Sequence, residues 1–110
     1  MSAKIPEVIG RYQDAHDRHD VDQALGAFEA EAIVRDEDQE WIGRSAIRDW
    51  LIKTSTEYSF TRTLLSVEED VAGTWVIRNR LQGNFPGGVV DLRYRFELDG
   101  DHITALTIAP

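Results

Sequence analysis

An acidic segment that follows a short apolar run is the first place in this sequence where chemistry is expected. Residues 32–34 are typical of a strand and lead directly to Asp36. Three further acids follow, namely Glu37, Asp38 and Glu40. A carboxylate held among apolar walls has a raised pKa, because burial disfavours its charged form. Asp36 is therefore a candidate general base, and the alternative is a solvated carboxylate among acidic neighbours.

Other polar and aromatic side chains are candidates for a binding pocket. Tyr12 and His16 lie one turn apart on the apolar stripe of a predicted helix, where a core role competes with a pocket role. Asn79 is polar in an otherwise apolar row, so it either binds a ligand or satisfies neighbouring backbone groups. The aromatic residues expected in the core or in an apolar pocket wall are Trp41, Trp50, Phe60, Trp75 and Tyr94.

The sequence predicts neither a metal ion nor a cofactor. Its 3 histidines lack zinc-ligand spacing, and the acidic segment lacks the glycine and ligand spacing of a calcium loop. It has no glycine-rich phosphate loop and no nucleophile elbow. The absence of cysteine excludes a disulfide scaffold and a thiolate metal site, and it fits a reducing compartment.

Length and charge restrict the class of protein and its partners. The 110 residues are expected to form a single domain over residues 1–110. The formal net charge of −8 disfavours nucleic acid and anionic membrane surfaces as partners. The chain has no apolar run near the roughly 20 residues of a membrane span, and its amino terminus has no signal-peptide core. We therefore expect a cytoplasmic protein.

The first half of the chain is predicted to be mainly helical. Apolar residues recur at helical spacing over residues 5–19. Asp20 is expected to cap a short second helix, with Phe28 on its apolar face. A third amphipathic helix is expected after Gly43.

The second half is predicted to be a β-meander. The hydrophobic period changes to two, and short turns separate the runs, which favours antiparallel neighbours. Apolar residues occupy one face of these strands, while the other face is polar and is either solvated or paired in a dimer. Helices followed by such strands predict an α+β domain with helices on one sheet face. The expected strands are residues 58–68, 74–85, 89–99 and 103–108.

Several short motifs occur in an order typical of one superfamily. They are Arg11-Tyr12, His19-Asp20, Leu25-x-x-Phe28, Ala32-x-Val34-x-Asp36, Trp41-x-Gly43 and Leu92-x-Tyr94-x-Phe96-x-Leu98-Asp99-Gly100. Over essentially the whole chain, the sequence resembles the SnoaL-like branch of the nuclear transport factor 2 superfamily. The resemblance implies three N-terminal helices packed in a strongly curved, mostly antiparallel sheet. This sheet would form a cone with an internal pocket, and the protein would be a homodimer.

Two further comparisons within the superfamily concern the site. The turn Gly-Asn-Phe-Pro-Gly-Gly at residues 83–88 resembles that of small bacterial SnoaL-like proteins. In the ketosteroid isomerase branch, a helix tyrosine stabilises an oxyanion and a strand-end aspartate moves the proton. Tyr12 and Asp36 match those positions without a gap. Tyr94 takes the place of that branch's third, protonated acid, while Asp91 is expected on the opposite face.

Other branches of the superfamily match less well. Epoxide hydrolases of this fold carry an Arg-x-Asp pair, whereas this chain has Arg78-Asn-Arg80 and Asp91-Leu-Arg93. Dehydratases of the fold use two pocket histidines, and here only His16 is expected to face inward.

We therefore expect a small-molecule enzyme of the SnoaL-like or ketosteroid-isomerase-like type. It would be an isomerase, cyclase or dehydratase that transfers a proton on an apolar carbonyl-type substrate. Asp36 would move the proton and Tyr12 would stabilise the oxyanion, while Tyr94, Asn79 or His16 would orient the substrate. The alternative is a non-catalytic module that binds a hydrophobic ligand or forms a dimeric interaction surface. A third reading is an engineered or reconstructed chain.

Overall fold

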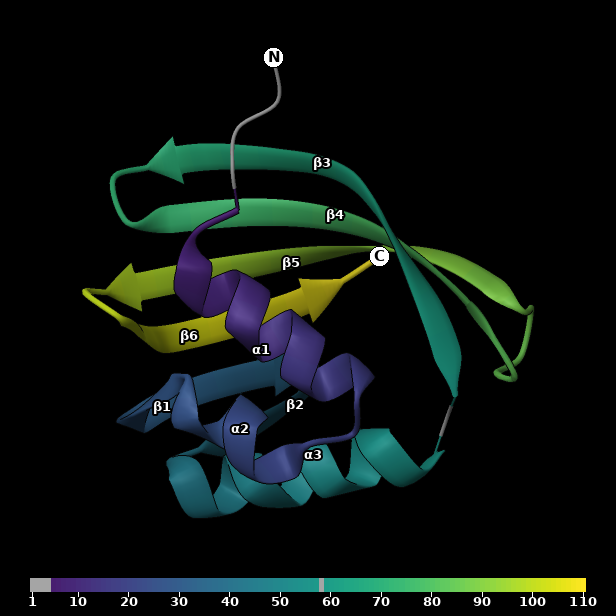
Figure 1. Cartoon of the computed structure of the whole chain (residues 1–110), viewed down its shortest axis with the longest axis horizontal. Helices are drawn as coiled ribbons and strands as arrows, with labels where there is room; N and C mark the ends of the chain where they lie inside the picture. Colours follow the sequence, from purple (N-terminus) through teal and green to yellow (C-terminus); the bar gives the residue numbers. More distant parts are fainter. Residues whose placement is uncertain (1–4, 58) are drawn as a thin grey trace.

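The computed structural model describes residues 5–57 and 59–110, and Tyr58, at the start of one predicted strand, lies outside them. The described residues form three helices and six strands (Figure 1). In chain order these are α1 (Glu7–Asp17), α2 (Val21–Gly26), β1 (Phe28–Asp36), β2 (Gln39–Ile42), α3 (Arg44–Glu57), β3 (Phe60–Val71), β4 (Thr74–Gly83), β5 (Val89–Asp99) and β6 (His102–Ala109).

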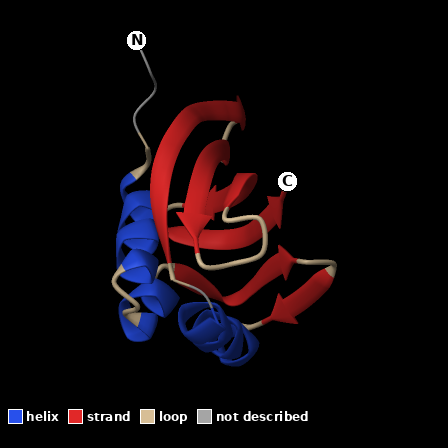
Figure 2. Cartoon of the chain, turned by 90° about the vertical axis from the view of Figure 1, so that its right-hand side faces the viewer, coloured by secondary structure: helices blue, strands red, loops and turns tan. Residues whose placement is uncertain are grey.

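The six strands form one open sheet in the order β2-β1-β6-β5-β4-β3. All neighbours are antiparallel except β1 and β6, which run parallel. Parallel neighbours need a long connection, and here the chain between β1 and β6 supplies it. Figure 2 shows the strands strongly bent, with the helices gathered on one side of the sheet. The predicted α+β class and curved, mostly antiparallel sheet are confirmed.

The two faces of the sheet have different chemistry. On β5, Tyr94 and Phe96 are buried, while Arg93 and Arg95, which alternate with them, are exposed. Several charged side chains on the outer face form ion pairs within the chain. Arg80 Nε lies 2.8 Å from Asp91 Oδ1, and Arg95 Nη1 lies 3.0 Å from Asp70 Oδ2. Asp91 therefore lies on the outer face, opposite Tyr94, as predicted. The structure holds a single chain, so the homodimer remains a prediction.

The helices close the inner face of the sheet. α1 buries Val8, Ile9 and Tyr12 in a core that includes Phe28 and Phe96. These apolar side chains recur every three or four residues, so they form one stripe that faces the sheet. No helix in the described part of the chain is long and apolar enough to cross a membrane.

The cap of α2 agrees with the sequence analysis, but the end of this helix does not. The Asp20 carboxylate accepts a hydrogen bond from the Gln23 amide at 3.2 Å, as expected of an N-cap. The helix ends at Gly26, because glycine is a poor helix former. Phe28, predicted on its apolar face, instead begins β1, where it is fully buried against α1. That prediction was wrong.

Gly83 is required by close packing where β3 and β4 meet. A Cβ there would contact the Ser59 carbonyl oxygen and would lie 2.7 Å from Phe60 Cβ. We expect Gly83→Ala to lower the free energy of unfolding by about 1–3 kcal/mol, the usual cost of overpacking. The measurement is urea unfolding followed by circular dichroism.

Gly26→Ala is the matched control for this prediction. A Cβ at Gly26 meets nothing within 4 Å, and the residue is helical. Because alanine favours a helix over glycine, this variant should be neutral or stabilised by up to about 1 kcal/mol. An equal loss in both variants would show that packing at Gly83 is not the cause.

Candidate active site

A cavity of about 560 Å³ lies between the sheet and the helices α1 and α3. Its wall combines apolar strand residues such as Leu81, Val90, Leu92 and Ile108 with polar groups from the helices. The residues predicted for the site or its wall that line it are Tyr12, His16, Asp36, Trp41, Trp50, Phe60 and Tyr94.

Asp36 reaches the cavity because a tight turn ends β1 there. Glu37 and Asp38 form the turn to β2, with φ of 52° and 61°. Two residues with positive φ give a turn whose twist matches that of the flanking strands. The Asp36 carboxylate faces α3, where Oδ2 accepts a hydrogen bond from Trp50 Nε1 at 3.2 Å. Asp36 therefore differs from its acidic neighbours, because its carboxylate is held against a helix.

The surroundings of Asp36 favour a proton acceptor. Burial raises the pKa of its carboxyl group above the ordinary value, and the nearby Glu37 carboxylate adds to this rise. The hydrogen bond from Trp50 and the charge of Lys53 oppose the rise without cancelling it. A carboxylate with a raised pKa is a stronger base at neutral pH.

Two tyrosines contribute hydroxyl groups to the same cavity. Tyr12 is 1% exposed and packs edge-on against Phe28 and Phe96, with ring centroids 5.3 and 5.9 Å apart. Tyr94, from β5, is 4% exposed. Burial raises the pKa of both hydroxyls. Both side chains are therefore protonated at neutral pH and can donate hydrogen bonds to a ligand oxygen.

His16 is held as a neutral imidazole. Its ring stacks between Trp50 and Phe60, with centroids 6.2 and 6.1 Å away. The Thr54 hydroxyl donates to the Leu51 carbonyl at 3.2 Å, so it accepts from His16 Nε2–H at 3.0 Å. Nδ1 then carries no proton, and it is buried without a hydrogen-bond partner in the described part of the chain. Burial and then the Arg62 charge lower the pKa of His16 to about 4.

Arg62, on β3, is a cavity residue that the sequence analysis missed. Its side chain is only 8% exposed, and its Nη2 lies 3.0 Å from Asp17 Oδ1 on α1. The guanidinium carbon lies 5.3 Å from the centre of the Tyr94 ring. Phe60 and Arg62 are two residues apart on one strand, so their side chains share a face. That spacing was the signal available in the sequence.

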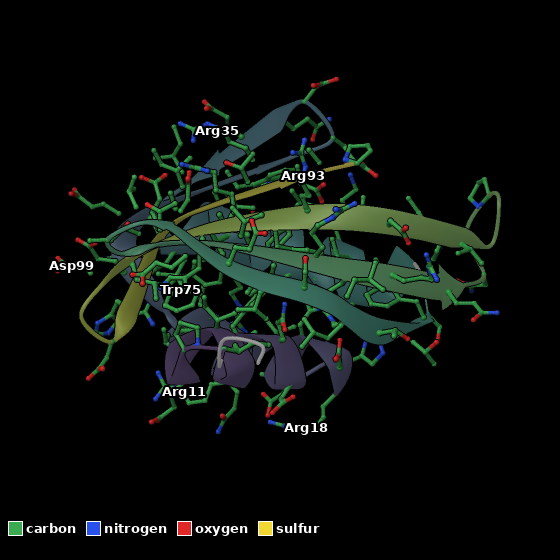
Figure 3. All side chains as sticks on the ribbon, turned by 90° about the horizontal axis from the view of Figure 1, so that it is seen from above. Arg11, Arg18, Arg35, Trp75, Arg93 and Asp99 are labelled. Atoms are coloured by element: carbon green, nitrogen blue, oxygen red, sulfur yellow. The ribbon has the colours of Figure 1, made fainter. Side chains whose placement is uncertain are left out.

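Two other predicted residues do not line the cavity. Trp75 and Asn79 face inward on β4 with Leu81, but only Leu81 lines the cavity. Figure 3 shows Trp75 between the sheet and the helix that carries Arg11. Asn79 is fully buried, and its amide nitrogen and oxygen have no hydrogen-bond partner among the described residues. The cavity lies toward the β4–β5 turn, so these side chains belong to the packed end of the sheet.

The described residues, 5–57 and 59–110, contain no group of three His, Cys, Asp or Glu side chains that could hold a metal ion. The cavity lining offers carboxylate, hydroxyl, imidazole and guanidinium groups.

Comparisons with known proteins place this architecture. No protein-family model and no curated protein matches the sequence. A Sinorhizobium meliloti protein to which polyketide cyclase activity is attributed is 28% identical, with 96% of this chain and 95% of that chain covered and a TM-score of 0.89. A protein with a ketosteroid isomerase-like fold from Catenulispora acidiphila is 17% identical, with 97% of this chain and 87% of that chain covered and a TM-score of 0.85.

A third solved structure identifies the fold by name. It is a nuclear transport factor 2-like protein of unknown function from Cytophaga hutchinsonii, 12% identical, covering 99% of this chain and 93% of that chain, with a TM-score of 0.76. This chain has the nuclear transport factor 2-like fold. The neighbours agree with the predicted resemblance to its SnoaL-like branch. Fold alone does not specify a reaction, because one fold carries many functions.

The buried neutral state of His16 predicts a pH dependence of stability. Its pKa is about 4 in the folded chain and near 6.5 when unfolded, so below pH 6.5 the unfolded state binds more protons. Folding should lose about 2 kcal/mol from this group between pH 7 and pH 5. His16→Gln should show a correspondingly smaller loss in urea unfolding at the two pH values.

His102→Gln is the control, since the His102 side chain is exposed at the start of β6. This variant should retain the wild-type difference in stability between the two pH values. A His16→Gln variant that also retains it would contradict a buried neutral imidazole.

Proposed function

We propose that this chain is a small-molecule enzyme that transfers a proton next to a carbonyl group of an apolar substrate. The observation that carries the proposal is that a half-buried carboxylate, Asp36, and a buried hydroxyl donor, Tyr12, line one largely apolar cavity. A base and an oxyanion donor are the two groups that such a reaction needs.

The reaction follows from these groups. Asp36 takes a proton from the carbon beside the carbonyl, and the electrons of the broken C–H bond move to the carbonyl oxygen. Tyr12 donates a hydrogen bond to the resulting enolate oxygen, and Tyr94 provides a second hydroxyl in the same cavity. Return of the proton to another carbon gives isomerisation. Attack of the enolate on a second carbonyl gives cyclisation, and the proton held by Asp36 passes to the new alkoxide. Loss of a β-hydroxyl gives dehydration, and the same proton leaves with the hydroxyl as water.

Trp50 has a positioning role in this scheme. Its indole N–H occupies one carboxylate oxygen of Asp36, at 3.2 Å. The other oxygen remains to accept the proton, and the α3 helix keeps the carboxylate aimed at the cavity. The similarity to a protein with attributed polyketide cyclase activity supports the same class of chemistry.

A non-catalytic binding module is the second candidate. The observation that favours it is Tyr94, which occupies the position of a protonated acid in the ketosteroid isomerase branch. A tyrosine hydroxyl, like a protonated acid, can donate one hydrogen bond to a ligand. Replacing the acid by tyrosine therefore preserves ligand binding even where it removes catalysis. Binding and turnover must therefore be measured separately.

The enzyme proposal is tested with two proton-transfer probes, 5-nitrobenzisoxazole and a β,γ-unsaturated ketone, each followed by absorbance. Asp36→Asn keeps an acceptor for Trp50 but cannot take a proton, so kcat/KM should fall at least about 100-fold. Tyr12→Phe should lower kcat by about 100-fold, the cost of one oxyanion donor. Because the pKa of Asp36 is raised, wild-type kcat/KM should increase with pH through that pKa.

Glu40→Gln is the matched carboxylate control, since Glu40 is exposed on β2 and pairs with Arg35 at 2.7 Å. It should keep the wild-type rate. A wild-type chain that binds both probes without converting either supports the binding module. Wild-type rates in Asp36→Asn would show that Asp36 is not the base.

A further inference from the structure

Arg62 is a buried cation with an unused donor at the wall of the cavity. Its Nε and Nη2 both approach Asp17 Oδ1, at 3.1 and 3.0 Å, so one edge of the guanidinium is occupied. Nη1 is buried and has no hydrogen-bond partner of ordinary geometry among the described residues, while the Tyr94 hydroxyl also interacts with the guanidinium. The aromatic rings of Phe60 and Tyr94 lie 5.9 and 5.3 Å from the guanidinium carbon.

A buried N–H group beside a cavity is expected to bind an oxygen acceptor. A buried donor without a partner destabilises a fold, and the effect is larger for a charged group. The planar guanidinium suits a carboxylate in particular, because two parallel N–H groups can meet two oxygens. The cavity beside Arg62 is walled by apolar and aromatic side chains, among them Trp50, Phe60 and Leu92.

We propose that the cavity binds amphipathic monocarboxylates, with the ligand carboxylate on Arg62 and an aromatic or alicyclic body against the apolar wall. This inference names a substrate class for the proposed function, but binding can be measured whether or not turnover occurs. It also gives Arg62 a role beyond its ion pair with Asp17.

The charges that line the cavity favour a single negative charge on the ligand. Asp36, Glu37 and Asp38 lie along the same cavity and would repel a dianion such as a phosphate monoester. Lys53 is the other cation of the lining, and its Nζ lies 5.9 Å from the centre of the Trp41 ring, near the acidic turn. Lys53 is therefore the competing position for a carboxylate, and it must be tested as such.

Binding is measured by calorimetry at pH 7.5 with 2-naphthoate and its neutral isostere 2-naphthamide. The wild-type chain should bind the carboxylate about 10- to 100-fold more tightly, the range expected of a charged hydrogen bond. Arg62→Met should remove this preference. Equal wild-type affinities for the two compounds would overturn the proposal.

Asp17→Asn separates ligand binding from a structural ion pair. Without its counter-ion, Arg62 should hold 2-naphthoate at least as tightly as in the wild-type chain, and the ligand should raise Tm more. If Arg62 only ties β3 to α1, both Asp17→Asn and Arg62→Met would destabilise the chain and neither would alter ligand preference. A loss of preference in Asp17→Asn as large as that in Arg62→Met would also overturn the proposal.

Three further variants complete the test. Arg62→Lys keeps the charge without the planar fork, so a reduced but measurable preference is expected, and it replaces Arg62→Met should that variant not fold. Lys53→Met should keep the preference, and its loss there would assign the carboxylate to Lys53 instead. Asp36→Asn removes a repelling carboxylate from the lining, so it should keep the preference for 2-naphthoate and bind it at least as tightly, while proton transfer is lost. Failure of either proposal can therefore be recognised separately.

Discussion

A single hydrogen bond, from the Trp50 indole nitrogen to the Asp36 carboxylate, joins the α3 helix to the end of β1. Without it, Asp36 would be one more acid at an exposed turn, beside Glu37 and Asp38. With it, the carboxylate is turned into the space under the bent sheet, where desolvation raises its pKa. The same indole stacks on His16, so α3 orders two titratable groups at once.

Burial acts on these groups in different directions. It raises the pKa of Asp36 and of the two tyrosines, and it lowers the pKa of His16. At neutral pH the cavity therefore combines a basic carboxylate, neutral hydroxyl donors and a neutral imidazole. The charge of Arg62 opposes the rise in the pKa of both tyrosines and adds to the fall in the pKa of His16. One buried cation therefore influences most of the site.

Much of the fold could be predicted from periodicity, because burial imposes it on the sequence. The alternation in β5 assigned Tyr94 and Phe96 to the inner face and Asp91 to the outer face, and the structure agrees. Phe28 was assigned to the wrong element because a single apolar residue fits the end of a short helix and the start of a strand equally well. Arg62 was missed because a charged residue in a strand usually faces solvent, and its ion pair with Asp17 spans 45 residues.

Which inward residues reach the cavity could not be predicted in the same way. Asn79 and Leu81 share a face on β4, yet only Leu81 lines the cavity. Alternation defines a face but not the position along it. That position depends on how the helices cross the sheet, which is a tertiary property.

The open sheet has a consequence for self-association. β3, 12 residues long, is an edge strand with unpaired backbone groups along one side, and Leu64 and Leu65 on it are exposed. Exposed edges of this kind can template pairing between copies and so lead to aggregation. Two irregularities interrupt the pairing of β3 with β4, and the acids at residues 68–70 occupy its far end. Bulges and charges of this kind blunt an edge against pairing with the edge strand of another copy.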